Sequence, residues 1–298
     1  MSLPSAQPSS WRFEAIGTSW EIVTAAPLGA DRRAAVSALI ERFDAEWSRF
    51  RADSVVSGLA AGGGRVPAPA DAPAMLDAFR ALSAATGGAV NPLVGGSLER
   101  LGYDPAYTLA AGAPVAAPAD WTSLLTWDDG ILSLAASAVI DVGALGKGRL
   151  VDLVLDLVHA DGAGDVVIDA GGDLAVRGAP QRVGLEHPFD PSRAIGVWEV
   201  TDAALCASAV NRRAWGDGLH HVLDARTGVP VRTIAATWAV AADAMTADAI
   251  ATALFFDGGP RLAHDGGVEW VRMTTDGAVQ WSPGCRADLF VRAASVES

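Results

Sequence analysis

The sequence predicts an α+β fold in one large domain. Segments with strand-like and helix-like patterns of apolar residues are intermixed along the chain, without the regular alternation that a parallel βαβ sheet requires. No internal repeat and no linker divides the chain. Its 298 residues are half hydrophobic, which is enough for a substantial core. We therefore expect one domain over 11–298, preceded by a disordered Ser/Pro-rich tail over 1–10.

The first third of the chain is expected to contain a strand pair and amphipathic helices. Apolar residues alternate after Trp11 and again around Trp20, on either side of Gly17-Thr18-Ser19, which predicts one strand or a hairpin. Apolar residues from Val36 to Phe50 recur three or four positions apart, as on one face of a helix. The expected elements are a strand or hairpin over 11–24, helices over 31–50 and 72–86, a loop over 60–73, and a turn and extended stretch over 86–94 before a short helix that ends near Gly102.

The remainder of the chain is expected to be mainly β structure with two further helices. The run 243–256 is rich in alanine and strongly helical in pattern, and a helix is expected to end at His159. Residues 104–120 are rich in Ala and Pro and are expected to be irregular. Strands are expected over 131–134, 137–142, 165–169, 174–177, 181–185, 195–200, 203–208 and 236–241, with a strand and polar turn over 219–230 and a small β region over 268–273, 278–281 and 288–292.

Composition excludes several classes of partner. The formal net charge of -13 argues against nucleic acid or an anionic membrane as the main partner. Cys206 and Cys285 lie far apart without C-x-x-C spacing, so neither a disulfide framework nor a zinc site is indicated, and a reducing compartment is favoured. The N-terminus lacks the basic and apolar regions of a signal peptide, and no apolar stretch reaches the ~20 residues of a membrane span. We expect a cytoplasmic protein without a membrane segment.

A glycine-rich stretch from Val139 to Asp152 is the strongest local signal. A short β-branched run leads into Asp141, three glycines surround Lys147, and apolar residues follow at helical spacing, which predicts a strand, a tight turn and a helix. Glycine amides, a helix N-terminus and a lysine favour a phosphate-bearing ligand. The P-loop pattern G-x-x-x-x-G-K-[ST] is not met, because Gly148 stands where Ser or Thr is required. A turn that uses glycine only for compactness is an equally good interpretation of this stretch alone.

Asp248 and Thr252 form a candidate metal site on the alanine-rich helix. Four residues apart, they project from one face, one turn from each other. A carboxylate and a hydroxyl suit Mg²⁺, which completes its coordination with substrate phosphates. An isolated pair of this kind is more often structural, with the hydroxyl bonded to a helix carbonyl. The apolar surroundings predict burial of this helix, however, and a buried carboxylate needs a partner.

Three further groups of residues are weaker candidates. His220 and His221 precede Asp224, and alternation along a strand places one histidine inward as a possible general base, although either is more often a surface or core histidine. Asp169 and Asp173 flank a Gly-Gly turn, for which a structural role is favoured over a metal or ligand site. Cys206 and Ser208 lack the His and Asp spacing of a nucleophilic triad.

Seven short segments follow one another over most of the chain. They are Gly17-Thr18 with Trp20, Ser48-Arg-Phe-Arg-Ala-Asp-Ser54, Gly88-Ala-Val-Asn-Pro92, Asp141 to Asp152, Ala170-Gly-Gly-Asp173, His220 to Gly228, and Ala247-Asp-Ala-Ile-Ala-Thr-Ala253. In the same order, they resemble an N-terminal strand and the motifs S-x-Y-x-x-D-S, G-A-x-D-P, D-x-G-x-x-x-K-G-x-x-x-D, A/G-G-G-D, H-H-I-I-D-P-x-T-G and A-D-A-x-x-T-A of the ApbE family, the FAD:protein FMN transferases.

This resemblance implies a single large domain related to the T-fold, with mixed sheets, packed helices and a flavin cleft. It implies a Mg²⁺-dependent enzyme that moves FMN from FAD onto a Thr or Ser hydroxyl of an acceptor protein and releases AMP. By position, the Ala144 carbonyl and the side chains of Asp248 and Thr252 would hold Mg²⁺, and His221 or Asp248 would take the hydroxyl proton. The residues implied to contact FAD are Trp20, Phe50, Ala89, Val90, Asn91, Asp141, Lys147 and Leu223.

The chain departs from the family pattern at several positions. Phe50 replaces Tyr, Asn91 replaces Asp, Cys206-Ala-Ser-Ala209 stands where Thr-Ser-Gly is typical, and Ala225 replaces Pro. Three hypotheses therefore remain: a flavin transferase, a Mg²⁺-dependent FAD pyrophosphatase that gives FMN and AMP, and a non-catalytic FAD-binding protein. The intact Asp248 and Thr252 pair favours an enzyme, because flavin storage needs no metal.

Overall fold

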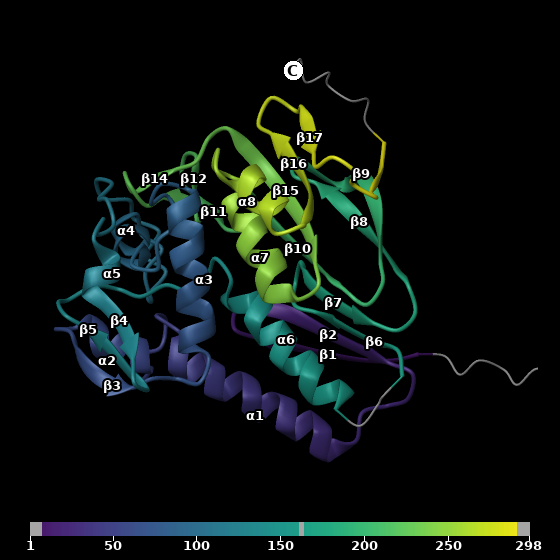
Figure 1. Ribbon diagram of the computed structural model, residues 1–298, viewed down its shortest axis with the longest axis horizontal. Helices are drawn as coiled ribbons and strands as arrows, with labels where there is room; N and C mark the ends of the chain where they lie inside the picture. The colour runs from purple at the N-terminus through teal and green to yellow at the C-terminus, as the bar shows by residue number, and fades with distance from the viewer. Residues whose placement is uncertain (1–7, 161–163, 291–298) are drawn as a thin grey trace, which may run out of the picture.

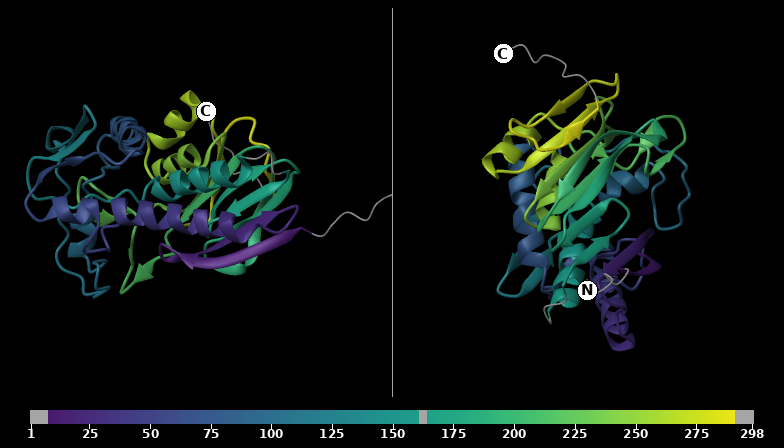
Figure 2. Two further views of the ribbon diagram at one scale, coloured as in Figure 1. Left: turned by 90° about the horizontal axis from the view of Figure 1, so that it is seen from below. Right: turned by 90° about the vertical axis from the view of Figure 1, so that its right-hand side faces the viewer.

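An eight-stranded antiparallel sheet forms the centre of the protein (Figure 1). The computed structural model describes residues 8–160 and 164–290. The chain colours run in sequence across the sheet, from the purple N-terminal hairpin at one edge to the yellow strands at the other (Figure 2, right). In spatial order the strands are β1 (Ser9–Ala15), β2 (Thr18–Thr24), β6 (Val166–Asp169), β7 (Asp173–Arg177), β10 (Ala204–Ala209), β15 (Ile234–Ala241), β16 (Glu269–Thr274) and β17 (Val279–Trp281).

Helices cover one face of this sheet. The helices α1 (Ala30–Trp47), α6 (Gly146–His159) and α7 (Ala244–Ala253) pack in succession, and α8 (Gly259–Asp265) follows beside α7. The alanines of α7 make it thin enough to lie close to β10 and β15. Gly148 allows α6 to approach α7, because a Cβ at this position would lie 2.2 Å from the Ala244 carbonyl oxygen. The Gly-rich turn before α6 and the polar residues of α7 are thereby brought together.

A small sheet covers the opposite face. It contains β18 (Asp288–Leu289), β9 (Asp190–Val200) and β8 (Gln181–His187), in that order and antiparallel. Trp198 of β9 and Trp238 of β15 belong to the hydrophobic core between the two sheets. A second and larger core lies under the helices. The protein therefore has three layers, with helices, a central sheet and a small sheet.

The remaining elements form a region beside the sheet, on the left of Figure 1. Its three strands pair in the order β3-β5-β4, and helix α3 packs against α7 and α8. Two short ribbons, β11–β12 and β13–β14, lie near this region. The bounds are α2 (Val55–Ala60), β3 (Gly64–Pro67), α3 (Ala72–Ala85), α4 (Gly95–Arg100), α5 (Trp121–Leu124), β4 (Leu125–Asp128), β5 (Ile131–Leu134), β11 (Ala214–Trp215), β12 (Leu219–His220), β13 (Leu223–Asp224) and β14 (Val229–Pro230).

The α+β class predicted from the sequence is confirmed, as are most elements. Residues 11–24 form a hairpin that turns at Ile16 and Gly17, and the predicted helices appear with shifts of a few residues at their ends. Residues 104–120 contain no helix or strand. Among the described residues, no helix is both long and apolar enough to cross a membrane.

Several boundaries predicted from the sequence are wrong. Residues 64–67 form β3 instead of a loop, because they pair with β5. Residues 137–142 are not a strand, since they have no strand neighbour and Asp141 donates its amide hydrogen to the Pro92 carbonyl. Ser9 and Ser10 pair with β2 and are not part of a tail, whereas residues 1–7, 291 and 292 lie outside the described residues. The short elements α2, α5, β4, α8 and β11 were not predicted.

Candidate active site

The turn before α6 is held by Asp141. Its Oδ1 accepts a hydrogen bond from the Gly143 amide at 2.7 Å. The Gly146 amide donates to the Val142 carbonyl at 2.8 Å, and α6 begins at Gly146. The predicted turn and helix are therefore present, although the strand before them is not. The turn leaves the Ala144 carbonyl available to a neighbouring element.

That neighbouring element is α7, which supplies Asp248 and Thr252 from one face. Asp248 is 1% exposed, and its Oδ2 accepts a hydrogen bond from the Gly148 amide at 3.0 Å. Thr252 Oγ1 donates to the Ala144 carbonyl oxygen at 3.1 Å, across 108 residues of sequence. The three residues predicted to bind a metal thus lie together, in contact with one turn of the chain.

These donors fit Mg²⁺ better than a softer metal. A carboxylate, a hydroxyl and a carbonyl are hard oxygen ligands, whereas zinc sites favour Cys and His. Within residues 8–160 and 164–290, no group of three or more His, Cys, Asp or Glu side chains is placed to hold a metal. A metal held by Ala144, Asp248 and Thr252 would need oxygens from a bound ligand, as Mg²⁺ does when it binds with substrate phosphates.

Buried charges lie around Cys206, on the strand beneath this site. Burial raises the pKa of the Cys206 thiol well above its usual range, the negative charge of Asp248 raises it further, and Lys147 opposes them. A thiol that stays protonated is a poor nucleophile, which argues against a nucleophilic role for Cys206.

Asp152 accepts hydrogen bonds from the Ala244 and Met245 amides at 2.7 and 2.9 Å, and burial raises its pKa to about 6. Asp152 therefore caps the N-terminus of α7.

Lys147, in the first turn of α6, forms an ion pair with Asp173 at the start of β7. The Lys147 side chain is 23% exposed, whereas that of Asp173 is 0% exposed. Asp169, on the other side of the Gly-Gly turn, accepts hydrogen bonds from the Gly171 and Gly172 amides. Asp169 therefore has the structural role that was expected for both aspartates. Asp173 instead contacts Lys147 of the candidate site.

The two histidines have different environments. His220 Nε2 lies 2.8 Å from the Val231 carbonyl and its Nδ1 accepts from the Val222 amide at 3.3 Å, so both ring nitrogens are engaged. His221 Nδ1 is buried and has no hydrogen-bond partner among the described residues. Burial, and then the positive charge of Arg213, lowers the pKa of His221 to about 3. His221 is therefore neutral at pH 7.

Lys147 links His221 to the turn before α6. Its positive charge is among the causes that lower the pKa of His221, and it also acts on Cys206. Charges are weakly screened in a protein interior, so the Lys147 ammonium acts on both groups. Lys147 is therefore the charged residue that the candidate base and the Cys206 strand have in common.

An aromatic cluster adjoins Asp141. The Phe50 ring stacks on Tyr107 at 5.4 Å and meets Tyr103 edge-on at 5.3 Å, and Leu223 packs into the same apolar cluster. Arg49 connects this cluster to the turn. Its Nε donates to Asp141 Oδ2 at 2.6 Å, and its guanidinium carbon lies 4.1 Å from the centre of the Phe50 ring.

The other residues predicted to contact FAD are buried. Trp20 packs in the main core and donates from Nε1 to the Ala15 carbonyl at 3.3 Å. The Ala89 carbonyl accepts from the Ala225 amide, and Val90 is also in the core. Asn91 donates to the Pro118 carbonyl and accepts from the Leu93 amide, each at 2.8 Å. The Asn91 side chain therefore holds the local backbone.

Arg49 and Asp152 were not predicted as site residues, and Asp173 was a weaker candidate for which a structural role was favoured. All three lie within the seven segments that carry the family resemblance. Burial separates them from ordinary charged residues: the side chains of Arg49 and Asp173 are 3% and 0% exposed. For Asp173 the signal was a charged side chain inside a run of small and apolar residues, from Ala170 to Val176.

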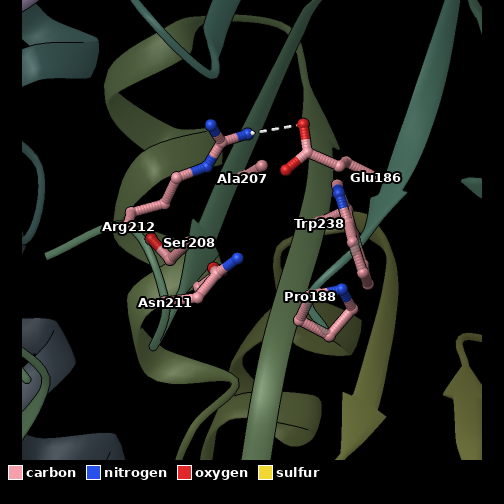
Figure 3. A pocket seen from close by; sticks show the side chains of 8 residues that line it. Glu186, Pro188, Ala207, Ser208, Asn211, Arg212 and Trp238 are labelled. Carbon is pink, nitrogen blue, oxygen red and sulfur yellow. Dashed lines mark hydrogen bonds and ion pairs between the residues drawn. The ribbon is translucent and has the colours of Figure 1, made fainter. Parts of the chain in front are cut away.

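Two cavities of the structure lie apart from these residues. Figure 3 shows the smaller, of about 20 Å³, where the Arg212 and Glu186 ion pair of 3.2 Å faces Trp238. Because Trp238 belongs to the core between the sheets, this hollow is on the side of β15 away from α7. The larger cavity, of about 640 Å³, lies between α8 and β16 beside Trp270. Neither cavity contains a residue predicted to bind FAD or metal.

Comparison with known proteins agrees with the geometry. The model of the ApbE family matches residues 16–271. An FAD:protein FMN transferase of Rhodobacter capsulatus is 30% identical, over 93% of this chain and 57% of the relative, and one of Treponema pallidum is 27% identical, over 74% and 69%. The chain thus spans little more than half the length of the Rhodobacter relative.

Solved structures show the same fold. The ApbE protein of Thermotoga maritima superimposes with a TM-score of 0.81 at 24% identity, covering 93% of this chain and 97% of the other. The flavinyl transferase ApbE of Pseudomonas stutzeri gives a TM-score of 0.80 at 22% identity, with coverage of 95% and 96%. The family model covers most of the sequence, and the fold agrees over nearly all of it. The chain belongs to the ApbE family.

Proposed function

We propose that this protein is a Mg²⁺-dependent FAD:protein FMN transferase, which moves FMN from FAD onto a Thr or Ser hydroxyl of an acceptor protein and releases AMP. The observation that carries the proposal is the meeting of the Ala144 carbonyl, Asp248 and Thr252 next to Lys147. Relatives named as FAD:protein FMN transferases support the same activity. The cytoplasmic location stays a prediction, and the free thiols of Cys206 and Cys285 are compatible with it.

The oxygen donors of the site would hold Mg²⁺, which supplies positive charge to neutralise a pyrophosphate and to stabilise the departing AMP. The protein's own contribution begins with binding. Lys147 offers a second positive charge on the same turn, and the glycine amides around it permit close approach of an anion. These groups explain how a protein with a net charge of -13 binds an anionic ligand.

His221 is proposed to take the proton of the acceptor hydroxyl. Its Nδ1 is enclosed by protein, so the proton is accepted at Nε2 of the neutral ring, with the ring hydrogen on Nδ1. The hydroxyl oxygen then forms a bond to the phosphorus of the FMN half, and the bond between that phosphorus and the bridging oxygen of AMP breaks. The low pKa of His221 keeps the ring neutral before this step.

The flavin side of the site is proposed to be the cluster of Phe50 and Leu223. The Phe50 ring lies between the Arg49 guanidinium and Tyr107, and Asp141, beside Arg49, retains lone pairs for a ligand hydrogen bond. Trp20, Ala89, Val90 and Asn91 shape this side through the backbone they hold. The replacement of the family's tyrosine by Phe50 removes one hydroxyl but keeps the stacking surface.

The direct test is an incubation with FAD, in the presence and absence of Mg²⁺ and of a panel of peptides that each carry one Ser or Thr. AMP release and covalently attached flavin are followed together. The proposal predicts both products only when Mg²⁺ and an acceptor are present. Release of AMP without an acceptor would show FAD pyrophosphatase activity instead. Binding of FAD without release of AMP in any mixture would indicate a non-catalytic FAD-binding protein.

A further inference from the structure

Asp173 lies wholly buried against the lysine that the proposed function assigns to the phosphates. Its side chain is 0% exposed, and its Oδ2 forms the ion pair with Lys147 Nζ. The second oxygen, Oδ1, has no hydrogen-bond partner among the described residues. Lys147 is 23% exposed, so the cation reaches the surface while the carboxylate does not.

The strand register determines where this carboxylate points. Asp173 lies directly opposite Cys206 in the antiparallel pair of β7 and β10, so the two side chains share one face of the sheet. Cys206 Sγ donates to the Ala244 carbonyl at the start of α7 at 3.4 Å. The shared face is therefore the one covered by helices, and Asp173 lies on the same side as Asp248 and Thr252.

Lysine alone is an imprecise phosphate ligand. It carries a compact charge on a flexible four-carbon stem, with three donors that rotate freely. A fixed carboxylate that takes one of these donors restricts the stem and leaves two donors for an anion. Asp173 is fixed in this sense, because β7 is paired on both sides, with β6 and β10.

We propose that Asp173 is a positioning residue, which holds the Lys147 ammonium where it meets the pyrophosphate of FAD. This inference rests on the proposed function. Asp173 acts only through Lys147 and does not touch the reacting atoms. If the ion pair only stabilised the fold, replacing Asp173 would lower the melting temperature without a specific effect on kcat. If Asp173 positions Lys147, its effect on kcat should depend on the presence of Lys147, which a double-mutant cycle measures.

The cycle uses Asp173→Asn, Lys147→Met and the double variant, with Asp169→Asn as the matched control. Asp169 flanks the same Gly-Gly turn, and an asparagine there keeps an oxygen for the Gly171 and Gly172 amides. Three quantities are measured for each protein: the melting temperature, FAD affinity from flavin fluorescence without Mg²⁺, and kcat for FMN transfer at saturating FAD.

We expect Asp173→Asn to lower kcat by about tenfold or more, because small misplacements of positioning groups have effects of this size. Its FAD dissociation constant should change by less than about threefold, since the cation remains. Lys147→Met should weaken FAD binding by about tenfold or more. Adding Asp173→Asn to Lys147→Met should cause no further loss of kcat and should raise the melting temperature, because it removes an unpaired buried charge. Asp169→Asn should match the wild type.

Independent, multiplicative losses of kcat in the double variant would overturn the inference, as would a wild-type kcat in Asp173→Asn. If Asp173→Asn is too unstable to assay, the double variant is compared with Lys147→Met instead. A kcat of the double variant below that of Lys147→Met would contradict the proposal. The proposed function fails in a different way: the wild type itself would give neither acceptor-dependent AMP nor covalently attached flavin, and the inference would fall with it.

Discussion

Thr252 Oγ1 donates a hydrogen bond to the Ala144 carbonyl oxygen at 3.1 Å, although 108 residues separate the two in the chain. This contact joins α7 to the turn that precedes α6. It places a hydroxyl and a carbonyl side by side, one helical turn from the buried carboxylate of Asp248. The candidate metal site is therefore a consequence of how these two helices pack.

Thr252→Val should weaken Mg²⁺ binding without disturbing the fold. Valine has nearly the shape of threonine but lacks the hydroxyl, so one oxygen donor is lost and the Ala144 carbonyl loses its partner. We expect the Mg²⁺ concentration for half-maximal AMP release to rise roughly 10- to 100-fold. The measurement is a Mg²⁺ titration at saturating FAD and acceptor. An unchanged midpoint would remove Thr252 from the ligand set.

Gly148→Ala should destabilise the packing of α6 on α7. The added Cβ would lie 2.2 Å from the Ala244 carbonyl oxygen, so the helices must separate. We expect the free energy of unfolding to fall by about 1–3 kcal/mol, measured by urea denaturation. Gly58→Ala in α2 is the control, because a Cβ there has no atom within 4 Å, and it should be neutral or slightly stabilising. Equal stability of both variants would contradict the close approach.

Arg49→Met should destabilise the protein by about 3–5 kcal/mol, because it leaves the Asp141 carboxylate without its buried cation. Asp141 Oδ2 receives the Arg49 Nε hydrogen bond at 2.6 Å, and the Arg49 side chain is 3% exposed. The control is Arg80→Met, which breaks an exposed ion pair with Asp77 and should cost less than about 1 kcal/mol. Chemical denaturation of the two variants gives the comparison, and a loss at Arg49 no larger than that at Arg80 would argue against a buried pair.

His221→Gln should make the free energy of unfolding less sensitive to a fall in pH. The pKa of His221 is lowered from 6.5 to about 3 in the folded protein, so below pH 6.5 the unfolded chain takes up a proton that the folded protein does not. The contribution of His221 to the free energy of unfolding is therefore complete above pH 6.5. It is lost as the pH falls, and the loss reaches about 2 kcal/mol near pH 5. Glutamine cannot titrate, so the wild type should lose more stability than the variant between pH 7 and pH 5.

The control for this measurement is His264→Gln, at an exposed position of α8. It removes a histidine from the surface and leaves the buried His221 in place. Unfolding is followed by denaturant titration at each pH, because the difference between the wild type and each variant isolates one residue from the carboxylates that also titrate. Parallel curves for His221→Gln and the wild type would show that His221 is not held neutral by burial.

Much of the fold was predictable from local patterns. The periodicity of Val36, Leu39, Ile40 and Phe43 predicted α1, and the Ala-rich run predicted α7, because each helix carries its own signal. The strand β3 and the irregular path of residues 137–142 were mispredicted, since both depend on whether a partner strand lies alongside. Pairing between distant segments leaves no local trace in a single sequence.

The residues of the candidate site also fall into those predictable from local patterns and those that depend on distant partners. Asp248 and Thr252 were found from their helical spacing, and Lys147 from the glycines around it. Arg49 was missed and Asp173 was assigned a structural role, because the role of each depends on burial and on a partner far away in the sequence, Asp141 and Lys147 respectively. The hypothesis of Mg²⁺ came from the oxygen ligands of Asp248 and Thr252, whereas FAD as the ligand was implied only by the family resemblance.

The most direct test of the account is Asp248→Asn, assayed for Mg²⁺-dependent release of AMP and covalent attachment of flavin. Asparagine keeps the shape of Asp248 and an oxygen for the Gly148 amide but removes the negative charge. Asp265→Asn, on the surface of α8, is the matched control. We expect Asp248→Asn to fold but to lose AMP release at every Mg²⁺ concentration up to many times the wild-type midpoint, whereas the control retains AMP release. Full activity of Asp248→Asn at the wild-type Mg²⁺ midpoint would contradict the proposed metal site.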